Sequence, residues 1–260
     1  MRSFKRLVLT FLLLTAGACM SKRVNPVHTA PTGEINGLAG FFMMCERDVQ
    51  NARGVVNNRE LVRNLTHLHR MNYGGKKYYL LERESITEMI QAVTEGVYSD
   101  FILVNGHGLV VYTRENDQIF GQNVNTSLKG SPLSRCFSSV ADGVHLEDVS
   151  QFPSSSGLYC MFAASRVMDD ESAHGAFILQ IDLERICGLI DEKTVIIDSD
   201  GLYRVSRRKD EILSSYPRFH LLKGSWLNSE GAVRFTLEGG VYTCYPFHFK
   251  NLDWTLIDEP

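Results

Sequence analysis

Two closely spaced histidines, His67 and His69, have the chemistry to form half of a metal site. They stand two positions apart in a stretch of helical composition. Residues two apart on a helix do not share a face, and no cluster of further ligand types accompanies them. Surface histidines are therefore the preferred interpretation, and we expect no metal site and no other cofactor.

A second candidate for metal chemistry, Asp198-Ser199-Asp200-Gly201, resembles part of a calcium-binding loop. The EF-hand pattern requires an earlier Asp and a Glu after the Gly, but those places hold Ile196 and Arg207. A hairpin turn is the better interpretation. The sequence also lacks a Gly-x-Ser-x-Gly elbow, a His-Glu-x-x-His motif and a phosphate-binding Gly loop. We therefore predict that the chain is not an enzyme, and a hydrolase on an unfamiliar fold is the weakest alternative.

Residues 1–18 have the organisation of an export signal peptide. A basic beginning is followed by an apolar stretch at residues 7–14, which is shorter than the roughly 20 residues that a membrane-spanning helix needs. Ala16-Gly17-Ala18 is an Ala-x-Ala cleavage site, which would give a soluble secreted protein. The same residues also resemble a bacterial lipobox, with Ala16 where that pattern prefers Leu, and Cys19 would then carry a lipid.

We favour lipidation at Cys19, with an uncleaved anchor as the third alternative. In every case the rest of the chain is expected outside the cytoplasmic membrane. With the favoured lipid on Cys19, it would be attached to a bacterial membrane, in the periplasm or at the surface. Residues 19–40 are predicted to form a tether, because they are rich in Pro, Gly, Thr and Asn and show no periodic apolar face.

The composition is that of an ordinary globular protein, with 44% apolar and 22% charged residues and a net charge of −3. The one basic run, Arg207-Arg208-Lys209, is followed at once by Asp210-Glu211, which indicates a solvated loop. Nucleic acid is therefore not an expected partner. Beyond Cys19 the cysteines are scattered, without a Cys-x-x-Cys pair or zinc spacing. We predict mostly reduced, buried thiols, with one disulfide possible, at Cys45, Cys136, Cys160, Cys187 and Cys244.

A similar phrase occurs twice, as VNGHGL at residues 104–109 and IDSDGL at residues 197–202. Each copy lies between two apolar runs. A β-run, a turn rich in Asn, Asp and Gly, and a second β-run predict a hairpin, because Gly and Asn tolerate the positive φ of a tight reversal. Two such hairpins in one chain suggest two similar modules in tandem.

The elements around these hairpins predict an α+β fold. Helices are expected at residues 41–68, 84–95, 132–139 and 183–189, the last with Asp182 as its N-cap. Strands are expected at residues 144–152, 158–168, 176–181, 233–237, 241–249 and 254–257, with a turn at Glu238-Gly239-Gly240. The predicted organisation is a helical region at residues 41–99, a larger module at 100–190 and a smaller one at 191–260.

Residues 100–204, together with two phrases further along the chain, resemble the double Cache domain, the PAS-like extracytoplasmic sensor of bacterial chemoreceptors and sensor kinases. The likeness rests on the number, order and spacing of short phrases rather than on any one of them. They are FILV at 101–104, VVYT at 110–113, FGQN at 120–123, Glu147-Asp148 followed by Phe152 and Gly157, FAASRV at 162–167, GAFILQ at 175–180, TVIIDSDGL at 194–202, GVY at 240–242 and WTL at 254–256.

The resemblance implies a long N-terminal helix beside two tandem modules with antiparallel sheets. It also implies a pocket for a small polar ligand, an amino acid or organic acid, in the membrane-distal module. By position, the wall of that pocket would draw on Tyr112, Arg114, Asp148, Tyr159, Phe162, Ser165 and Arg166. Arg114 or Arg166 would clamp an anionic ligand, since Arg can donate two parallel hydrogen bonds to a carboxylate.

Strand alternation places a limit on this wall. It puts Tyr159, Met161, Ala163, Ser165 and Val167 on one face, and Phe162, Ala164 and Arg166 on the other. Tyr159 and Arg166 therefore point in opposite directions unless a bulge intervenes.

The sequence departs from the family in three places. Arg166 stands where the family often has Pro, the second module is short between Arg208 and Val233, and Pro260 stands where a second membrane helix would begin.

We predict an exported sensor or binding lipoprotein that passes its ligand state to a partner receptor or transporter. The alternative is an interaction or scaffold lipoprotein whose distal pocket is filled by apolar side chains.

Overall fold

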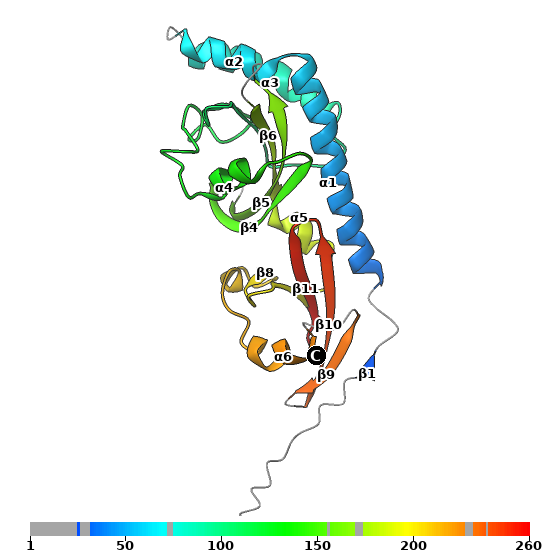
Figure 1. Cartoon of the computed structure of the whole chain (residues 1–260). Helices are drawn as coiled ribbons and strands as arrows, with labels where there is room; N and C mark the ends of the chain where they lie inside the picture. The colour runs from blue at the N-terminus through cyan, green and yellow to red at the C-terminus, as the bar shows by residue number, and fades with distance from the viewer. Residues whose placement is uncertain are drawn as a thin grey trace, which may run out of the picture.

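The computed structural model describes residues 25–26, 32–71, 75–154, 157–169, 174–226, 231–237 and 239–260. A long helix, α1 (Thr32–Asn58), runs beside two β-sheet modules stacked end to end (Figure 1). The predicted signal peptide, Cys19, and Glu238 of the predicted turn lie outside the described residues. None of the described helices is both long and apolar enough to cross a membrane.

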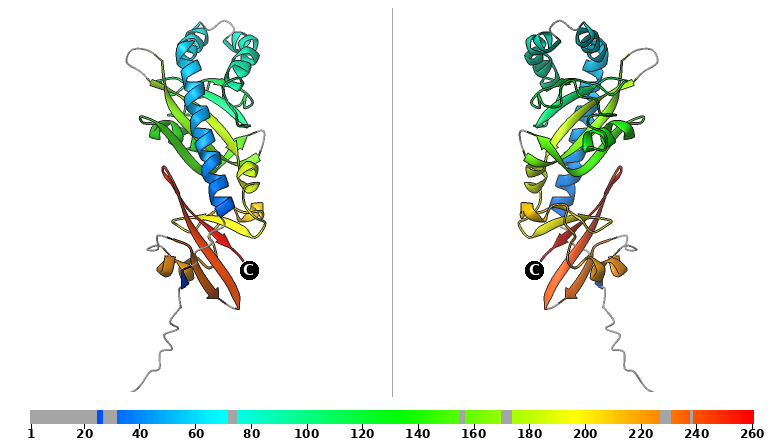
Figure 2. Two further views of the ribbon diagram at one scale, coloured as in Figure 1. Left: turned by 90° about the vertical axis from the view of Figure 1, so that its right-hand side faces the viewer. Right: turned by 90° about the vertical axis from the view of Figure 1, so that its left-hand side faces the viewer.

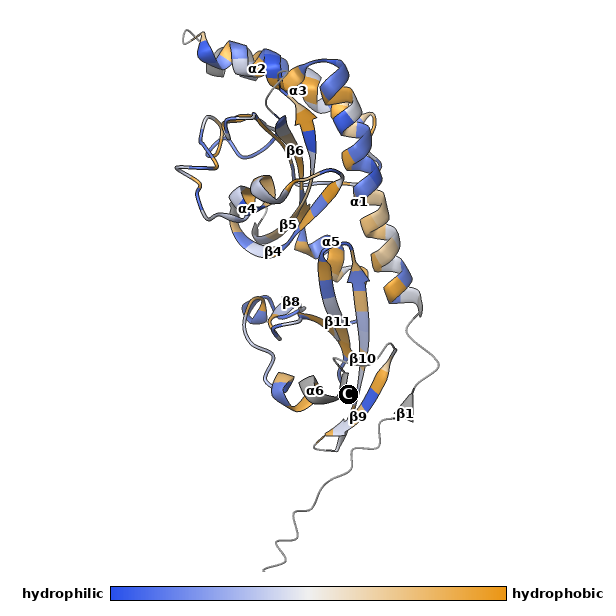
Figure 3. Ribbon diagram, viewed as in Figure 1, coloured by the Kyte–Doolittle hydropathy of each residue, from blue (hydrophilic) through white to orange (hydrophobic). Residues whose placement is uncertain are grey.

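The helix α1 forms because apolar residues recur along it at three- and four-residue steps, the mark of one buried face. Both hydrophilic and hydrophobic residues occur along it (Figure 3). Its fully buried apolar side chains are Leu38, Phe42, Cys45, Val49, Ala52 and Val56. The tether predicted over residues 19–40 is wrong from Thr32 onward, where α1 begins, and a short strand, β1 (Asn25–Pro26), also lies within it. The glycines that suggested a tether, Gly33, Gly37 and Gly40, have no neighbouring atom within 4 Å of where a Cβ would be.

The single helix predicted over residues 41–68 is in fact interrupted. Glu60 has φ 49°, in the left-handed region, and separates α1 from α2 (Leu61–Arg70). The next helix, α3 (Gly75–Gln91), begins before the predicted residue 84 and ends before residue 95. Its predicted buried face is confirmed at Ile86 and Ile90.

The larger module, at residues 100–190, is called the distal module and the smaller one, at residues 191–260, the proximal module. The distal module contains a five-stranded antiparallel sheet in the order β3-β2-β6-β5-β4. Its strands are β2 (Asp100–Val104), β3 (Val110–Thr113), β4 (Val144–Ser154), β5 (Gly157–Met168) and β6 (His174–Asp182). The first predicted hairpin is confirmed: β2 and β3 pair across residues 105–108, with Gly108 at φ 84°. This positive φ is the reason for a glycine at the turn.

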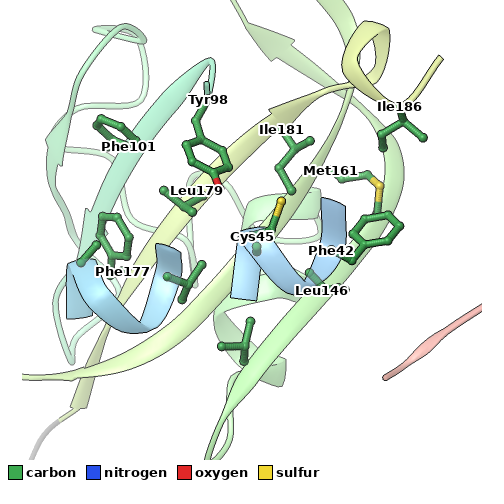
Figure 4. Packing of buried hydrophobic residues seen from close by; sticks show 14 of the residues in the cluster. Phe42, Cys45, Tyr98, Phe101, Leu146, Met161, Phe177, Leu179, Ile181 and Ile186 are labelled. Carbon is green, nitrogen blue, oxygen red and sulfur yellow. The ribbon is translucent and has the colours of Figure 1, made fainter. Parts of the chain in front are cut away.

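The two faces of the distal sheet bury different side chains, and the predicted alternation along β5 is confirmed. Met161, Ala163 and Val167 pack in the cluster that faces α1, whereas Phe162 and Ala164 pack in a second cluster on the opposite face. Figure 4 shows Phe42 and Cys45 of α1 lying against the strands that carry Met161 and Ile181. We call the opposite face, covered by α4 (Pro132–Ser139), the distal cluster.

The proximal module contains a separate six-stranded sheet in the order β1-β9-β10-β11-β7-β8. Its other strands are β7 (Thr194–Asp198), β8 (Tyr203–Val205), β9 (Val233–Leu237), β10 (Gly240–Phe249) and β11 (Leu252–Asp258). The second hairpin is confirmed at residues 198–201, and because its strands and those of the first hairpin lie in different sheets, the two modules are distinct (Figure 2). Gly201 has φ 82°, and a Cβ there would lie 2.3 Å from the ring of Phe219.

Short helices complete both modules. The predicted helix α4 is confirmed, with Ser131 as its N-cap accepting a hydrogen bond from the Ser134 backbone N–H at 3.1 Å. The helix α5 (Leu183–Cys187) is shorter than predicted, and Asp182 stands at its N-cap position without a side-chain capping bond. Between residues 208 and 233, the described residues form a 3₁₀ turn, η1 (Lys209–Glu211), and a helix, α6 (Phe219–Trp226).

Polar contacts join the two modules at β4. Asn251, in the turn between β10 and β11, exchanges two hydrogen bonds with the backbone of Leu146. Arg204 of β8 donates to the Val149 carbonyl at 2.6 Å and pairs with Asp148 at 3.2 Å. These contacts fix the orientation of one module relative to the other.

The five described cysteines carry free thiols, and all except the half-buried Cys187 are buried. Burial raises the pKa of Cys45, Cys160 and Cys244 to about 12, because the charged thiolate loses its solvation there. These thiols act as small apolar core residues.

Candidate functional site

Tyr112 and Arg114 make contacts that stabilise the fold of the distal module. Tyr112 is fully buried beneath α3, with its hydroxyl 2.7 Å from the hydroxyl of Thr87, and burial raises its pKa to about 12. Arg114 donates to the carbonyls of Tyr98 and Ser99 at 2.6 and 2.8 Å and stacks over Phe101, 4.7 Å from the ring centre. Arg114 therefore holds the segment that leads into β2.

Asp148 lies in the joint between the modules rather than in a distal pocket. Its carboxylate accepts hydrogen bonds from the Trp254 indole at 3.1 and 3.2 Å and pairs with Arg204. Burial raises its pKa, and the positive charge of Arg204 opposes that rise. The same guanidinium reaches Asp198 at 2.6 Å, so a single Arg bridges carboxylates of both modules.

The other four predicted residues, Phe162, Ser165, Arg166 and Tyr159, do not lie together in the fold. Phe162 is fully buried in the distal cluster, in edge contact with Phe152 at 5.2 Å. Ser165 is fully buried on the α1 side, and its hydroxyl has no partner among the described residues. Arg166 is exposed and donates to the Val140 carbonyl at 3.0 Å. Tyr159 is half-buried and lines a cleft described below.

The seven residues therefore do not converge on one cavity, and their contact with a ligand stays a prediction. The face where the resemblance puts the pocket is occupied by the distal cluster. Its buried members come from the sheet, from α4 and from the intervening loops. They are Ile102, Val104, Val110, Ile119, Val124, Leu133, Cys136, Val140, Phe152, Cys160, Phe162, Ala164, Ala176 and Ile178.

One polar residue on this sheet, Gln180, was not found from the sequence. It is 1% exposed, and neither its amide oxygen nor its amide nitrogen has a hydrogen-bond partner among the described residues. It pairs across the strands with Phe162 and Asp100. A buried amide without partners costs free energy, but a single Gln in an apolar strand gives no signal in sequence.

A cleft of about 780 Å³ opens between the two modules. We call it the intermodule cleft. The distal module contributes Tyr159 of β5 and residues of α5, and the proximal module contributes the segment after β8. Its lining consists of Tyr159, Asp182, Leu183, Glu184, Cys187, Ser206, Arg207, Lys209, Asp210 and Ile212. A volume of this size accommodates a small organic molecule.

Charged side chains surround the mouth of the intermodule cleft. Lys209 donates to Glu184 across it at 2.7 Å, and this hydrogen bond lowers the pKa of Glu184 and raises that of Lys209. Arg207 donates to the Ile190 carbonyl at 3.3 Å. The basic run that the sequence assigned to a solvated loop is indeed exposed, but two of its members also line this cleft.

Residues of the two motifs considered for metal chemistry make contacts within the fold. His69 makes an edge contact with Phe120, with ring centres 6.0 Å apart. The carboxylate of Asp198 accepts from the backbone N–H groups of Asp200 and Leu202 at 2.9 and 2.8 Å, as a hairpin turn requires. Among the described residues, no group of three or more His, Cys, Asp or Glu side chains is placed to hold a metal ion.

No family model matches the sequence, and no curated protein matches it. Solved structures share the fold at low identity. The ligand-binding domain of the Campylobacter jejuni chemoreceptor Tlp3 in complex with 4-methylisoleucine has a TM-score of 0.58 at 11% identity, covering 87% of this chain and 86% of that one. The sensor domain of the V. cholerae histidine kinase DctB has a TM-score of 0.57 at 15% identity, covering 87% and 93%.

An extracellular ligand binding receptor from Desulfohalobium retbaense DSM5692 has a TM-score of 0.59 at 12% identity. The match covers 87% of this chain but 38% of that receptor. The chain thus has the fold of extracytoplasmic sensor domains, and the double Cache fold that the sequence predicted is confirmed.

Proposed function

We propose that this chain is an exported, non-enzymatic binding domain that captures a small polar ligand and passes its ligand state to a partner receptor or transporter. The observation that carries the proposal is the intermodule cleft, with its charged mouth, in a fold shared with ligand-binding domains. The Tlp3 domain is described in complexes with 4-methylisoleucine and with L-valine, which supports a small polar ligand of the amino acid or organic acid class. A ligand that contacts both modules would alter their relation, and a partner could detect that change.

A thermal-shift screen tests the proposal. The chain without its signal peptide, carrying Cys19→Ser, is heated with amino acids, organic acids, purines and sugars. A true ligand at a hundredfold excess over its Kd is expected to add about 2.7 kcal/mol to the free energy of unfolding, because it binds only the folded state. If no compound in these classes raises the melting temperature, the small-molecule proposal fails.

Membrane attachment through a lipid on Cys19 is a separate part of the proposal, supported by the small residues before it in the sequence. Replacing Cys19 with Ser is expected to move the protein from the membrane fraction to the soluble fraction, or to stop its processing. Fractionation and intact-mass measurement follow the change. Unchanged partitioning, together with a mass that differs from the wild type only by the exchange of sulfur for oxygen, would exclude the lipid.

One observation favours an interaction or scaffold protein as the second candidate. The distal cluster fills the face where the sequence resemblance predicts a pocket, and its apolar side chains are buried. A scaffold with no ligand would have this feature. The thermal-shift screen separates the two functions, since a scaffold without a ligand would give no shift with any small molecule.

A further inference from the structure

We infer that the end of the molecule formed by α2 and α3 binds a second copy of this chain, with a cationic face of α2 in one copy against an acidic face of α3 in the other. The two helices pack against each other at the opposite end of the molecule from β1 (Figure 1). The contact does not depend on the small ligand of the proposed function, and it shares no residue with the lining of the intermodule cleft.

One face of α2 is cationic. Arg63, His67 and Arg70 stand at i, i+4 and i+7, so they share a face of the helix, and all three are exposed. The helix contains no acidic residue, and Arg70 makes no ion pair with any residue that the structure describes. Arg63 pairs with Glu60 at 3.4 Å, but both side chains are more than half exposed, so this pair contributes little. Asp169, beside α2, is 8% exposed, and its carboxylate accepts a backbone N–H at 2.9 Å.

One face of α3 carries the opposite charge. Leu81, Glu84 and Glu88 stand at i, i+3 and i+7, and all three are exposed. Among the described residues, neither Glu84 nor Glu88 has an ion-pair partner. The two carboxylates are four positions apart, and like charges at that spacing destabilise a helix slightly. A cationic surface placed against this face would offset the repulsion between them.

Exposed apolar side chains accompany both charged faces. Met71, directly after α2, is 63% exposed, and Leu80 and Leu81 of α3 are 50% and 66% exposed. Three of the eight large apolar side chains that are exposed in the described part of the chain therefore belong to this end. Burial of apolar surface drives association, and Met and Arg are both enriched at protein interfaces. This composition favours a protein as the partner.

A second copy is the protein partner that the charge pattern fits. A uniformly acidic partner would match α2 but would be repelled by Glu84 and Glu88, and a uniformly basic partner would be repelled by α2. Each copy of this chain carries both faces on adjacent helices. Two copies related by a twofold axis can therefore form the same contact twice, with α2 against α3 and α3 against α2.

Charge reversal on each helix tests the contact. The chain without its signal peptide, carrying Cys19→Ser, is studied by sedimentation velocity over a range of protein concentrations. We expect a monomer–dimer equilibrium that weakens as salt is added, because salt screens exposed charges. Reversing α2 with Arg63→Glu and Arg70→Glu, or reversing α3 with Glu84→Arg and Glu88→Arg, should weaken the dimer about tenfold or more, because attraction becomes repulsion at both contacts.

Mixing the two reversed chains separates a broken contact from a loss of folding. The α2-reversed chain has two acidic faces and the α3-reversed chain has two basic ones. Each should stay monomeric alone, whereas the mixture should form a dimer about as tight as that of the wild type. Lys129→Glu with Arg185→Glu is the matched control, since it reverses two exposed cations elsewhere and should leave the dimer unchanged. Melting temperatures verify that every variant is folded.

Three results would each overturn the inference: a wild type that stays monomeric at every concentration, a dimer that neither reversal weakens, and reversed chains that do not associate when mixed. A surface used by a different protein would give the first of these. The thermal-shift screen is a separate measurement. A ligand found for a monomeric chain leaves the proposed function standing and overturns the inference, whereas a dimer without any ligand does the opposite.

Discussion

Replacing Arg204 with Ala is expected to lower the free energy of unfolding by about 3–5 kcal/mol, because two largely buried carboxylates then lose their shared counter-charge. Arg204 contacts Asp148 at 3.2 Å and Asp198 at 2.6 Å, and its side chain is 17% exposed. It also donates to the Val149 carbonyl. The loss therefore affects the joint between the modules and the turn of the second hairpin together.

Urea unfolding of Arg204→Ala beside Arg208→Ala measures this effect. Arg208 is 62% exposed and pairs with Glu211 at 2.9 Å, so its replacement should cost less than about 1 kcal/mol. Hydrogen exchange at the Leu146 amide, which Asn251 holds from the other module, should accelerate only in Arg204→Ala. Equal stability of the two variants would show that the Arg204 contacts do not hold the modules together.

The destabilisation by Arg204→Ala is also expected to depend on pH. Burial raises the folded-state pKa of Asp148 above its ordinary value of 3.8, so protonation favours the folded state. Asp148 therefore contributes most stability below pH 3.8, and this contribution is lost as the pH rises through the raised folded pKa. Without Arg204 the charged form of Asp148 is less well compensated, so the deficit should be largest at neutral pH and smaller in acid.

Replacing Asp100 with Ala is expected to lower the free energy of unfolding by about 3 kcal/mol or more, because several buried donors lose their acceptor at once. Asp100 is 2% exposed. Its carboxylate accepts from the Thr113 hydroxyl at 2.6 Å and from backbone N–H groups of the loop that follows β3. Those N–H groups belong to Arg114, Glu115 and Asn116, at 2.7 to 3.2 Å.

Asp117→Ala is the matched control for Asp100→Ala. Asp117 lies in the same loop, but its side chain is 50% exposed and its contact is the 3.1 Å ion pair with Arg83. Thermal or urea unfolding should show a change of less than about 1 kcal/mol for the control. If Asp100→Ala is as stable as Asp117→Ala, the buried carboxylate does not organise the loop as the hydrogen bonds indicate.

Local patterns predicted the fold well where a periodicity or a turn residue carried the information. The two hairpins have glycine at positive φ, Gly108 and Gly201, and the alternation along β5 separates the two faces of the sheet. The start of α1 was missed because Gly33, Gly37 and Gly40 have low helix propensity, and packing of Leu38 and Phe42 overrides it. The helix break at Glu60 could not be predicted, because neither a glycine nor a proline stands next to it in the sequence.

The candidate site was predicted less well, because the intermodule cleft exists only in the tertiary structure. Its lining combines Tyr159, the region of α5 and the segment after β8. Tyr159 was predicted through the resemblance, whereas Arg207 was assigned to a solvated loop on local charge alone. Packing between distant segments decides which face of a sheet and which module a charged side chain contacts. Gln180 shows the same limitation, since a polar residue in a strand gives no indication of whether its partners are present.

The position of β11 in the proximal sheet constrains the order in which this chain can fold. β11 lies between β10 and β7 and pairs with both, so the two parts of that sheet, β1-β9-β10 and β7-β8, cannot join until residues 252–258 have been synthesised. Trp254 of β11 then packs against Phe42, near the beginning of α1, with ring centres 5.5 Å apart. Closing a contact between such distant segments is slow, because the loop entropy is lost before the contact forms. The proximal sheet of a nascent chain is therefore completed only after β11 has been synthesised, whereas every strand of the distal sheet is available once Asp182 has been made.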